Sequence, residues 1–135
     1  MQSLSIGQAA EEAGVGVETV RFYQRKGLIE KPPRRGTRHR RYPPEAVARI
    51  RFIRGAQKLG FSLKEIEELL ALRIAPDTSK ADVKARAEAK VAEIEEKLGD
   101  LQRMRDTLLR LIGACEGIGT LEDCPILEAF DRGPE

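Results

Sequence analysis

Two cysteines stand close together near the C-terminus, in the stretch "GACEGIGTLEDCPILEAF" over residues 113–130. They are Cys115 and Cys124, with eight residues between them, and the chain has no other cysteine. Two thiolates can hold a soft d10 ion in near-linear geometry, such as Cu(I), Ag(I), Au(I) or Hg(II). Gly117 and Gly119 lie between them and allow the loop to fold back. The pair could instead react with oxidants and electrophiles, or stay as free buried thiols.

The chain has 135 residues, enough for one domain, or for a small domain and a long helix. No apolar run approaches the ~20 residues of a membrane span, and the N-terminus has no secretory-signal pattern. We therefore expect a cytoplasmic protein without membrane contact. A reducing cytosol disfavours a structural disulfide, so the cysteine pair favours metal or redox chemistry.

Charge is divided unevenly along the chain. Residues 1–58 carry 13 Lys or Arg against 5 Asp or Glu, a net charge of +8, whereas residues 59–135 carry 11 against 17, a net charge of −6. This division predicts an N-terminal head that binds a polyanion. Few aromatic side chains accompany the basic ones, which favours double-stranded DNA over RNA.

Two short helices predict the element that reads DNA. Ser5 as N-cap and Gln8 three residues later predict a helix that ends near Gly14, and a second helix is expected over residues 17–26. This pair has the outline of a helix-turn-helix, whose second helix enters the major groove. Between residues 30 and 45, four prolines bracket a basic stretch that predicts a short hairpin, which we call the wing.

We predict DNA contacts from the outward face of the second helix and from the wing. Val17, Val20 and Phe22 are expected to face the core, so that Tyr23 points outward. Arginine suits phosphates and a narrow minor groove, and a tyrosine hydroxyl can donate to a phosphate. The candidate contacts are Thr19, Arg21, Tyr23, Arg25, Arg34, Arg35, Arg38, Arg40 and Arg41.

A long helix is expected over residues 81–112, which contain no proline and one glycine. Before it, a third helix is expected from about residue 44 to 59 and a fourth after Ser62, where Glu65 completes a capping box. Apolar residues recur along the long helix at heptad spacing and form a seam interrupted by Arg105. We expect the seam to pair with a second copy in a two-fold dimer, the alternative being packing on its own head. The seam residues are Ala87, Val91, Ile94, Leu98, Leu101, Leu108 and Ile112.

Most of the chain resembles one family, through "LSIGQAAEEAGVGVETVRFYQRKGLI", "RRYPPEAV", "RFIRGAQKLGFSLKEIEELL" and "CPILEAF". The first three stretches resemble the MerR family of bacterial transcription regulators, and the last resembles its metal-responsive branch. The resemblance implies a mainly α fold: a winged helix-turn-helix DNA-binding head, a long antiparallel coiled-coil dimerisation helix and a C-terminal effector loop. It also implies binding to promoter DNA whose spacer is too long, and distortion of that DNA on effector binding, so that bound RNA polymerase can start.

The chain then divides into four expected parts. These are a DNA-binding domain over residues 1–75, a linker over 76–80, a dimerisation helix over 81–113, and a metal- or effector-binding loop with the C-terminal segment over 114–135. The residues that match the family's motifs are Arg21 and Tyr23 of the recognition helix, Arg40 and Tyr42 of the wing, and Cys115 and Cys124 of the loop. The resemblance therefore adds Tyr42 to the candidate DNA contacts.

The chain departs from the family pattern at one position of the metal site. Many family sensors of divalent ions take a third ligand, a cysteine near the start of the partner's dimerisation helix, where the copper-type branch has serine. That position falls here on Lys80, with Ser79 beside it. An ammonium is no ligand for a soft metal, but it would balance the negative charge of two thiolates around a monovalent ion. The loop length instead resembles the divalent branch, so Hg(II) stays open, whereas tetrahedral zinc is disfavoured.

Three functions fit these observations. The first is a dimeric regulator that activates a metal-resistance promoter when a soft metal ion binds. The second keeps the DNA-binding head but senses oxidants or electrophiles through Cys115 and Cys124. The third is a metal-sequestering protein without specific DNA binding. Neither an enzyme nor an organic cofactor is expected, because we find no triad-like set, no Gly-rich phosphate loop and no convergent carboxylates.

Overall fold

The structure is a computed structural model that describes residues 3–33 and 40–134. These residues form six helices and no strand, so the expectation of a mainly α fold is confirmed. The chain separates into two compact units, residues 1–83 and 84–135. The four-part division proposed from the sequence stays a prediction.

The first two helices of the head begin and end where local chemistry requires. In α1 (Ile6–Ala13), Ser5 Oγ accepts the Gln8 N–H at 3.2 Å and Gln8 Oε1 accepts the Ser5 N–H at 2.9 Å, which is the expected capping box. The helix ends at Gly14, whose φ of 74° is the left-handed conformation that glycine adopts readily. After a short turn, α2 (Val17–Arg25) follows.

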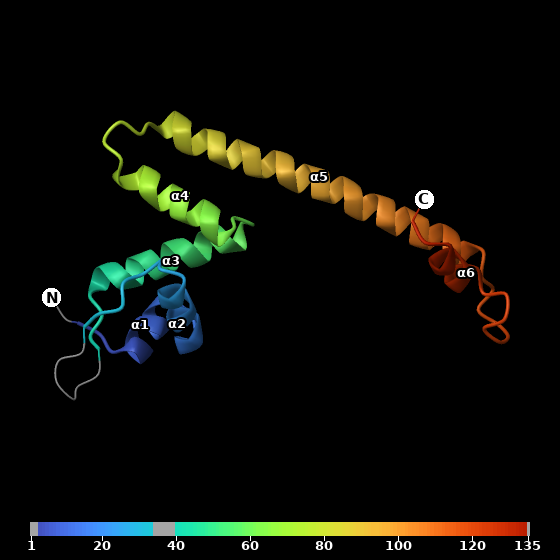
Figure 1. Ribbon diagram of the computed structural model, residues 1–135, viewed down its shortest axis with the longest axis horizontal. Coiled ribbons are helices and arrows are strands. Elements are labelled where there is room, and N and C mark those ends of the chain that lie inside the picture. The colour runs from blue at the N-terminus through green and yellow to red at the C-terminus, as the bar shows by residue number, and fades with distance from the viewer. Residues whose placement is uncertain (1–2, 34–39, 135) are drawn as a thin grey trace. The chain divides into compact units, whose positions relative to one another are not determined.

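The next two helices complete the head. Pro44 opens α3 (Pro44–Lys58), and its fixed φ suits the first helical turn. A second capping box, between Ser62 and Glu65, opens α4 (Leu63–Ile74). α1 packs against α2 and α3, and α3 packs against α4, as Figure 1 shows. The buried core is formed by Ala9, Ala10, Val20, Tyr23, Leu28, Ile29, Tyr42, Val47, Ile50, Ile53 and Ile66.

The described part of the wing is its C-terminal end, residues 40–42, which we call the wing base. Here Leu4 and Tyr42 form an isolated antiparallel bridge, with N–H···O distances of 2.8 and 2.7 Å. No longer hairpin occurs in the described residues. The three candidate contacts Arg34, Arg35 and Arg38 lie outside the described residues.

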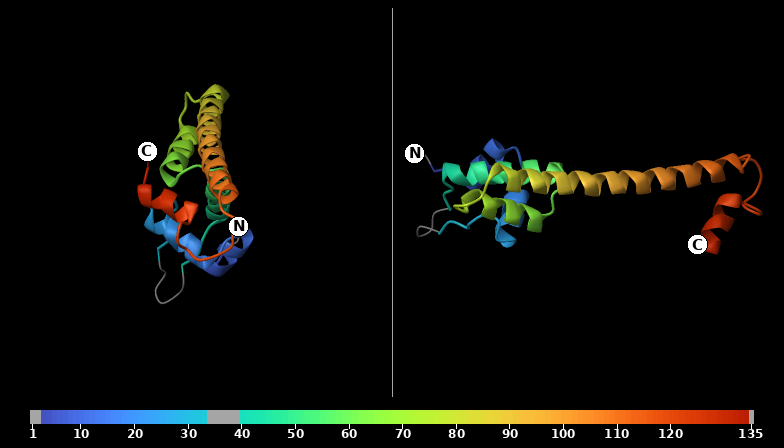
Figure 2. Two further views of the ribbon diagram at one scale, coloured as in Figure 1. Left: turned by 90° about the vertical axis from the view of Figure 1, so that its right-hand side faces the viewer. Right: turned by 90° about the horizontal axis from the view of Figure 1, so that it is seen from above.

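The second unit is dominated by one long helix, α5 (Lys80–Gly113), which begins within the first unit, one residue before its expected start. Figure 2 shows it without a break before a loop leads into the short α6 (Pro125–Arg132). On its surface, hydrogen bonds from Lys90 and Lys97 hold the pKa of the Glu93 carboxyl below its ordinary value. No helix in the described residues is long and apolar enough to cross a membrane.

Candidate functional site

The outward face of α2 carries two exposed arginines one turn apart, Arg21 and Arg25, while Thr19 is half-buried. Arg21 Nη1 lies 2.7 Å from Glu18 Oε1, and the two side chains are 52% and 80% exposed. Because an ion pair this exposed to water stabilises a protein only weakly, Arg21 can exchange Glu18 for a phosphate or a base edge. Both arginines are exposed on α2, as the sequence predicts.

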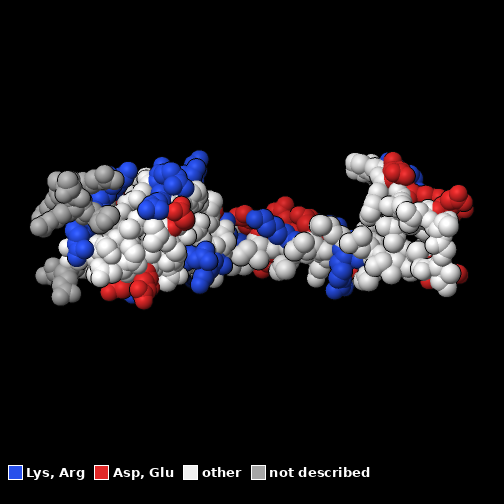
Figure 3. Space-filling view, turned by 90° about the horizontal axis from the view of Figure 1, so that it is seen from below, with Lys and Arg blue, Asp and Glu red and all other residues white. Residues whose placement is uncertain are grey.

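A further basic residue of this surface was missed in the sequence. Phe22 is half-buried, and the cationic groups of Arg25 and Lys26 lie over its ring, 6.0 and 5.7 Å from the centroid. Both positions are within reach because they follow Phe22 by three and four residues on a helix. The four-residue spacing from Phe22 to Lys26 could have identified Lys26 from the sequence. Lys and Arg groups outnumber acidic ones on the face of the head seen in Figure 3.

Tyr23 was expected to face outward, but it faces the core. It is 1% exposed, and its hydroxyl donates a hydrogen bond to Gln57 Oε1 of α3 at 2.6 Å. The expectation was wrong because Tyr23 follows Val20 by three residues and so shares its core-facing side. Burial raises the pKa of the Tyr23 hydroxyl, an effect that the positive charge of Arg54 partly offsets. Tyr23 thus fastens α2 to α3.

Tyr42 is also buried, at 2% exposure, so its ring does not lie on the surface. Its hydroxyl accepts a hydrogen bond from Gln24 Nε2 of α2. Beside it, Arg41 Nη2 donates to the Ser3 carbonyl oxygen at 2.8 Å and its Nε donates to Ser3 Oγ at 3.3 Å. The wing base is therefore joined both to the N-terminal segment and to α2.

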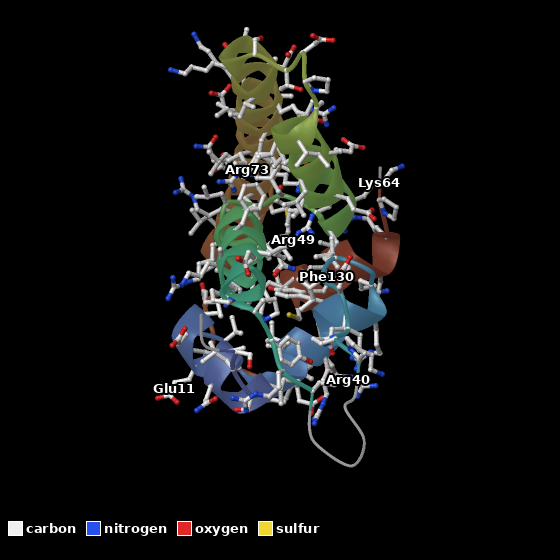
Figure 4. All side chains as sticks on the ribbon, turned by 90° about the vertical axis from the view of Figure 1, so that its left-hand side faces the viewer. Glu11, Arg40, Arg49, Lys64, Arg73 and Phe130 are labelled. Atoms are coloured by element: carbon white, nitrogen blue, oxygen red, sulfur yellow. The ribbon has the colours of Figure 1, made fainter. Side chains whose placement is uncertain are left out.

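Arg40 completes the wing base. It is half-buried, and its Nε is enclosed without a hydrogen-bond partner among the described residues. Figure 4 shows Arg40 at the same end of the head as α1 and α2, away from Arg49 of α3 and Lys64 of α4. Of the predicted wing contacts, Arg40 and Arg41 therefore lie in the described wing base, next to Tyr42, which bonds α2.

The two cysteines lie at either end of the loop between α5 and α6. Cys115 follows the last turn of α5 and its N–H donates to the Ile112 carbonyl oxygen at 3.1 Å. Cys124 is the N-cap of α6, and its carbonyl oxygen accepts the Glu128 N–H at 3.0 Å. Gly117 and Gly119 between them have φ of 74° and 105°, which bends the loop sharply.

Both thiols are free and half-buried. The Gly117 N–H lies 3.4 Å from Cys115 Sγ and donates to it. Cys124 sits at the N-terminus of α6, where its side chain makes no capping hydrogen bond. No group of three or more His, Cys, Asp or Glu side chains that could hold a metal occurs in the described residues, which leave out His39.

Lys80, expected at the family's third-ligand position, is the first residue of α5 and is exposed. Ser79 before it donates from both its N–H and its Oγ to Asp82 Oδ2, at 2.9 and 3.2 Å. Because the Ser79 hydroxyl donates to the Asp82 carboxylate, its hydrogen already has an acceptor. Lys80 is the freer of the two side chains to approach another charge.

The expected dimer seam is open to solvent in the single chain. Six of its seven members are among the large apolar residues that are exposed, from 40% at Ile94 to 58% at Leu101. The seventh, Ala87, is exposed too. Met104 and Leu109 extend the same apolar surface at 59% and 54%. Pairing with a second copy and packing on the chain's own head both stay predictions.

Comparisons with known proteins agree with these features. The family models described as "MerR HTH family regulatory protein" and "MerR, DNA binding" match residues 4–72 and 47–111. The chain is 42% identical over 133 residues to the mercuric resistance operon regulatory protein of Pseudomonas fluorescens, covering 98% of this chain and 91% of that one.

Two solved structures are similar along nearly the whole chain. The transcription regulator PbrR691 from Ralstonia metallidurans CH34, in complex with lead(II), has a TM-score of 0.81 at 31% identity and covers 94% of this chain and 98% of its own. The regulator MerR from Bacillus megaterium MB1, in complex with mercury(II), has a TM-score of 0.69 at 34% identity, with coverage of 95% and 99%. The chain belongs to the metal-responsive branch of the MerR family of helix-turn-helix transcription regulators.

Proposed function

We propose that this protein is a homodimeric activator of a metal-resistance promoter, switched by a soft metal ion bound between Cys115 and Cys124. The observation that carries the proposal is the placement of two free, half-buried thiols at the two ends of one loop. That loop joins the long helix to α6, so a bond between the sulfurs through a metal would fix how the two helices are connected.

The head supplies the DNA contacts. Arg21 and Arg25 of α2 are proposed to enter the major groove, with Thr19 beside them. Lys26, Arg40 and Arg41, together with wing residues 34, 35 and 38, are proposed to neutralise phosphates. The buried hydroxyls of Tyr23 and Tyr42 are already hydrogen-bonded within the head, and we now assign them to positioning.

The dimer is proposed to form along the exposed seam of α5, with the two helices antiparallel. A continuous apolar stripe of this length on one helix needs a partner to remove it from water. Antiparallel pairing brings the end of one α5 to the start of the other. It would therefore place Lys80 of one copy near the cysteine loop of its partner.

The metal is proposed to be Cu(I), Ag(I), Au(I) or Hg(II). The three similar proteins described above are named for mercury resistance or were solved with lead(II) or mercury(II), which favours a divalent ion. Lys80 points to a monovalent ion, because two thiolates around M(I) leave one negative charge that an ammonium can balance, whereas two around Hg(II) leave none. Either kind of ion accepts two sulfurs in a line, which fits a site made of the two thiols alone.

Activation is proposed to act through the DNA, because two heads tied to one dimer can bend and untwist the duplex between them. In vitro transcription with bacterial RNA polymerase tests this, on a template whose promoter carries the operator that the protein selects from a random pool. We expect run-off transcript to rise on adding Cu(I), Ag(I) or Hg(II) to the reduced protein, and to stay basal with Cys115→Ser/Cys124→Ser. Equal transcription from both proteins would overturn the proposal.

A second candidate is an effector that reacts with the thiols. Both thiols are free and only half-buried, so oxidants and electrophiles can reach them. A response that strong reductant abolishes, in the absence of metal, would favour this candidate. A response to metal that persists under strong reductant would exclude it.

A further inference from the structure

We propose that Gln24 and Tyr42 form a positioning pair that fixes the wing base on the recognition helix, so that Arg40 approaches the DNA backbone in register with α2. The inference deepens the proposed function, since it rests on DNA binding by the head. It assigns a role to two residues that themselves need not touch DNA.

Three sets of hydrogen bonds hold the wing base, and they join it to two different segments. The backbone of Tyr42 pairs with Leu4 through two hydrogen bonds, and Arg41 donates twice to Ser3. Both of these sets join the wing base to the N-terminal segment. The bond from Gln24 Nε2 to the Tyr42 hydroxyl is the side-chain hydrogen bond that joins it to α2 in the described residues.

Gln24 therefore connects two DNA-facing parts. It stands between Tyr23 and Arg25 on α2, while Tyr42 stands two residues after Arg40. Tyr42 is 2% exposed and Gln24 is half-buried, so the bond is partly shielded from water and holds its geometry better than a fully exposed contact would. Without it, the wing base keeps its link to residues 3–4 but loses its fixed position relative to Arg21 and Arg25. A freer Arg40 then no longer holds its phosphate contact, which lowers affinity.

The same helix contains a matched control. Tyr23 is as deeply buried as Tyr42 and also bonds a glutamine, Gln57, but that glutamine lies on α3. Tyr42→Phe and Tyr23→Phe each remove one buried hydroxyl and leave one glutamine amide without its partner. The two variants therefore cost the fold similar amounts, and only Tyr42→Phe disconnects the wing base from α2.

The test measures DNA affinity against salt by fluorescence anisotropy. The probe is a labelled 30-bp duplex bearing the operator that wild-type protein selects from a randomised pool. For Tyr42→Phe we expect affinity to fall about three- to tenfold at low salt and the slope of log K against log[salt] to decrease by about 0.9, the value of one lost phosphate contact. Gln24→Met should match it, and the double variant should lose no more than either one. Tyr23→Phe should keep the wild-type slope.

An unchanged slope in Tyr42→Phe and Gln24→Met would overturn the inference while leaving DNA binding by the head intact. An equal loss in Tyr23→Phe would also overturn it, because general loosening of the head would then explain the effect. If wild-type protein shows no salt-dependent DNA affinity, the proposed function fails and this inference fails with it. Circular dichroism checks folding, and Gln24→Met decides the result if Tyr42→Phe does not fold.

Discussion

Glu18 and Arg21 form an ion pair on the outward face of α2, with 2.7 Å between Oε1 and Nη1. DNA binding must replace this carboxylate with phosphate or base oxygens, and the carboxylate itself repels the duplex. We therefore expect Glu18→Gln to raise affinity for DNA about two- to fivefold at low salt, with the gain shrinking as salt screens it.

Fluorescence anisotropy at two salt concentrations measures this change. Glu11→Gln, which removes an exposed carboxylate from α1, is the control for net charge alone. A loss of affinity in Glu18→Gln would contradict the expectation and would mean that Glu18 itself accepts a hydrogen bond from a base.

The buried hydroxyl of Tyr23 makes head stability sensitive to alkali. Burial raises its pKa above the ordinary value of 10.0, so the unfolded chain releases this proton at lower pH than the folded one does. The stabilisation is fully present below that ordinary value and is lost as pH rises through the folded-state pKa. Urea unfolding between pH 8 and 11 should show this loss in the wild type.

Tyr23→Phe should flatten that part of the alkaline decline and cost about 1 kcal/mol at pH 8, where Gln57 loses its partner. Tyr42→Phe serves as the comparison, since it removes a buried hydroxyl elsewhere in the head. An alkaline decline of unchanged size in Tyr23→Phe would show that another group causes it.

Leu98 is exposed at 54% in the middle of the seam, where a partner helix should cover it. Leu98→Lys would place an ammonium in that dry contact, so we expect the dimer dissociation constant to rise at least about tenfold. Sedimentation equilibrium measures it. Glu96→Lys puts the same ammonium on the opposite side of α5 and should leave the dimer intact. Equal association of both variants would place the dimer contact elsewhere.

Lys80 is predicted to set the charge preference of the metal site. Lys80→Ser should lower affinity for Ag(I) about tenfold and leave affinity for Hg(II) unchanged, because only the monovalent bis-thiolate carries a charge to balance. Competition with chelators measures both constants. Lys84→Ser, one turn further along α5, controls for the loss of a lysine. A parallel fall for both ions would assign Lys80 to loop folding instead.

The local parts of the fold could be read from the sequence, and the long-range pairs could not. Ser5 with Gln8 and Ser62 with Glu65 fix their helix starts through neighbours three residues away, so the capping pattern predicts them. The seam follows from heptad spacing in the same way.

The hydrogen-bond partners of the two tyrosines could not be predicted from the sequence. Tyr23 bonds a residue 34 positions away and Tyr42 one 18 positions away, and no local period encodes such partners. Their position beside arginines suggested DNA contacts, but Tyr23 shares its helix face with Val20, and packing against α3 determined its orientation. The cysteines were identifiable as a pair, whereas the helix N-terminus at Cys124 and the N–H at Cys115 Sγ came only from the structure.

The most direct test of the metal-switch account is an anaerobic titration of the reduced protein with Cu(I), then Hg(II) and Zn(II), against competing chelators. X-ray absorption then counts the sulfurs around the bound ion. We predict tight binding of Cu(I) or Hg(II) by two sulfurs, weak binding of Zn(II), and loss of the tight site in Cys115→Ser/Cys124→Ser. Failure of every ion to bind tightly, or equal binding by the serine variant, would contradict the account.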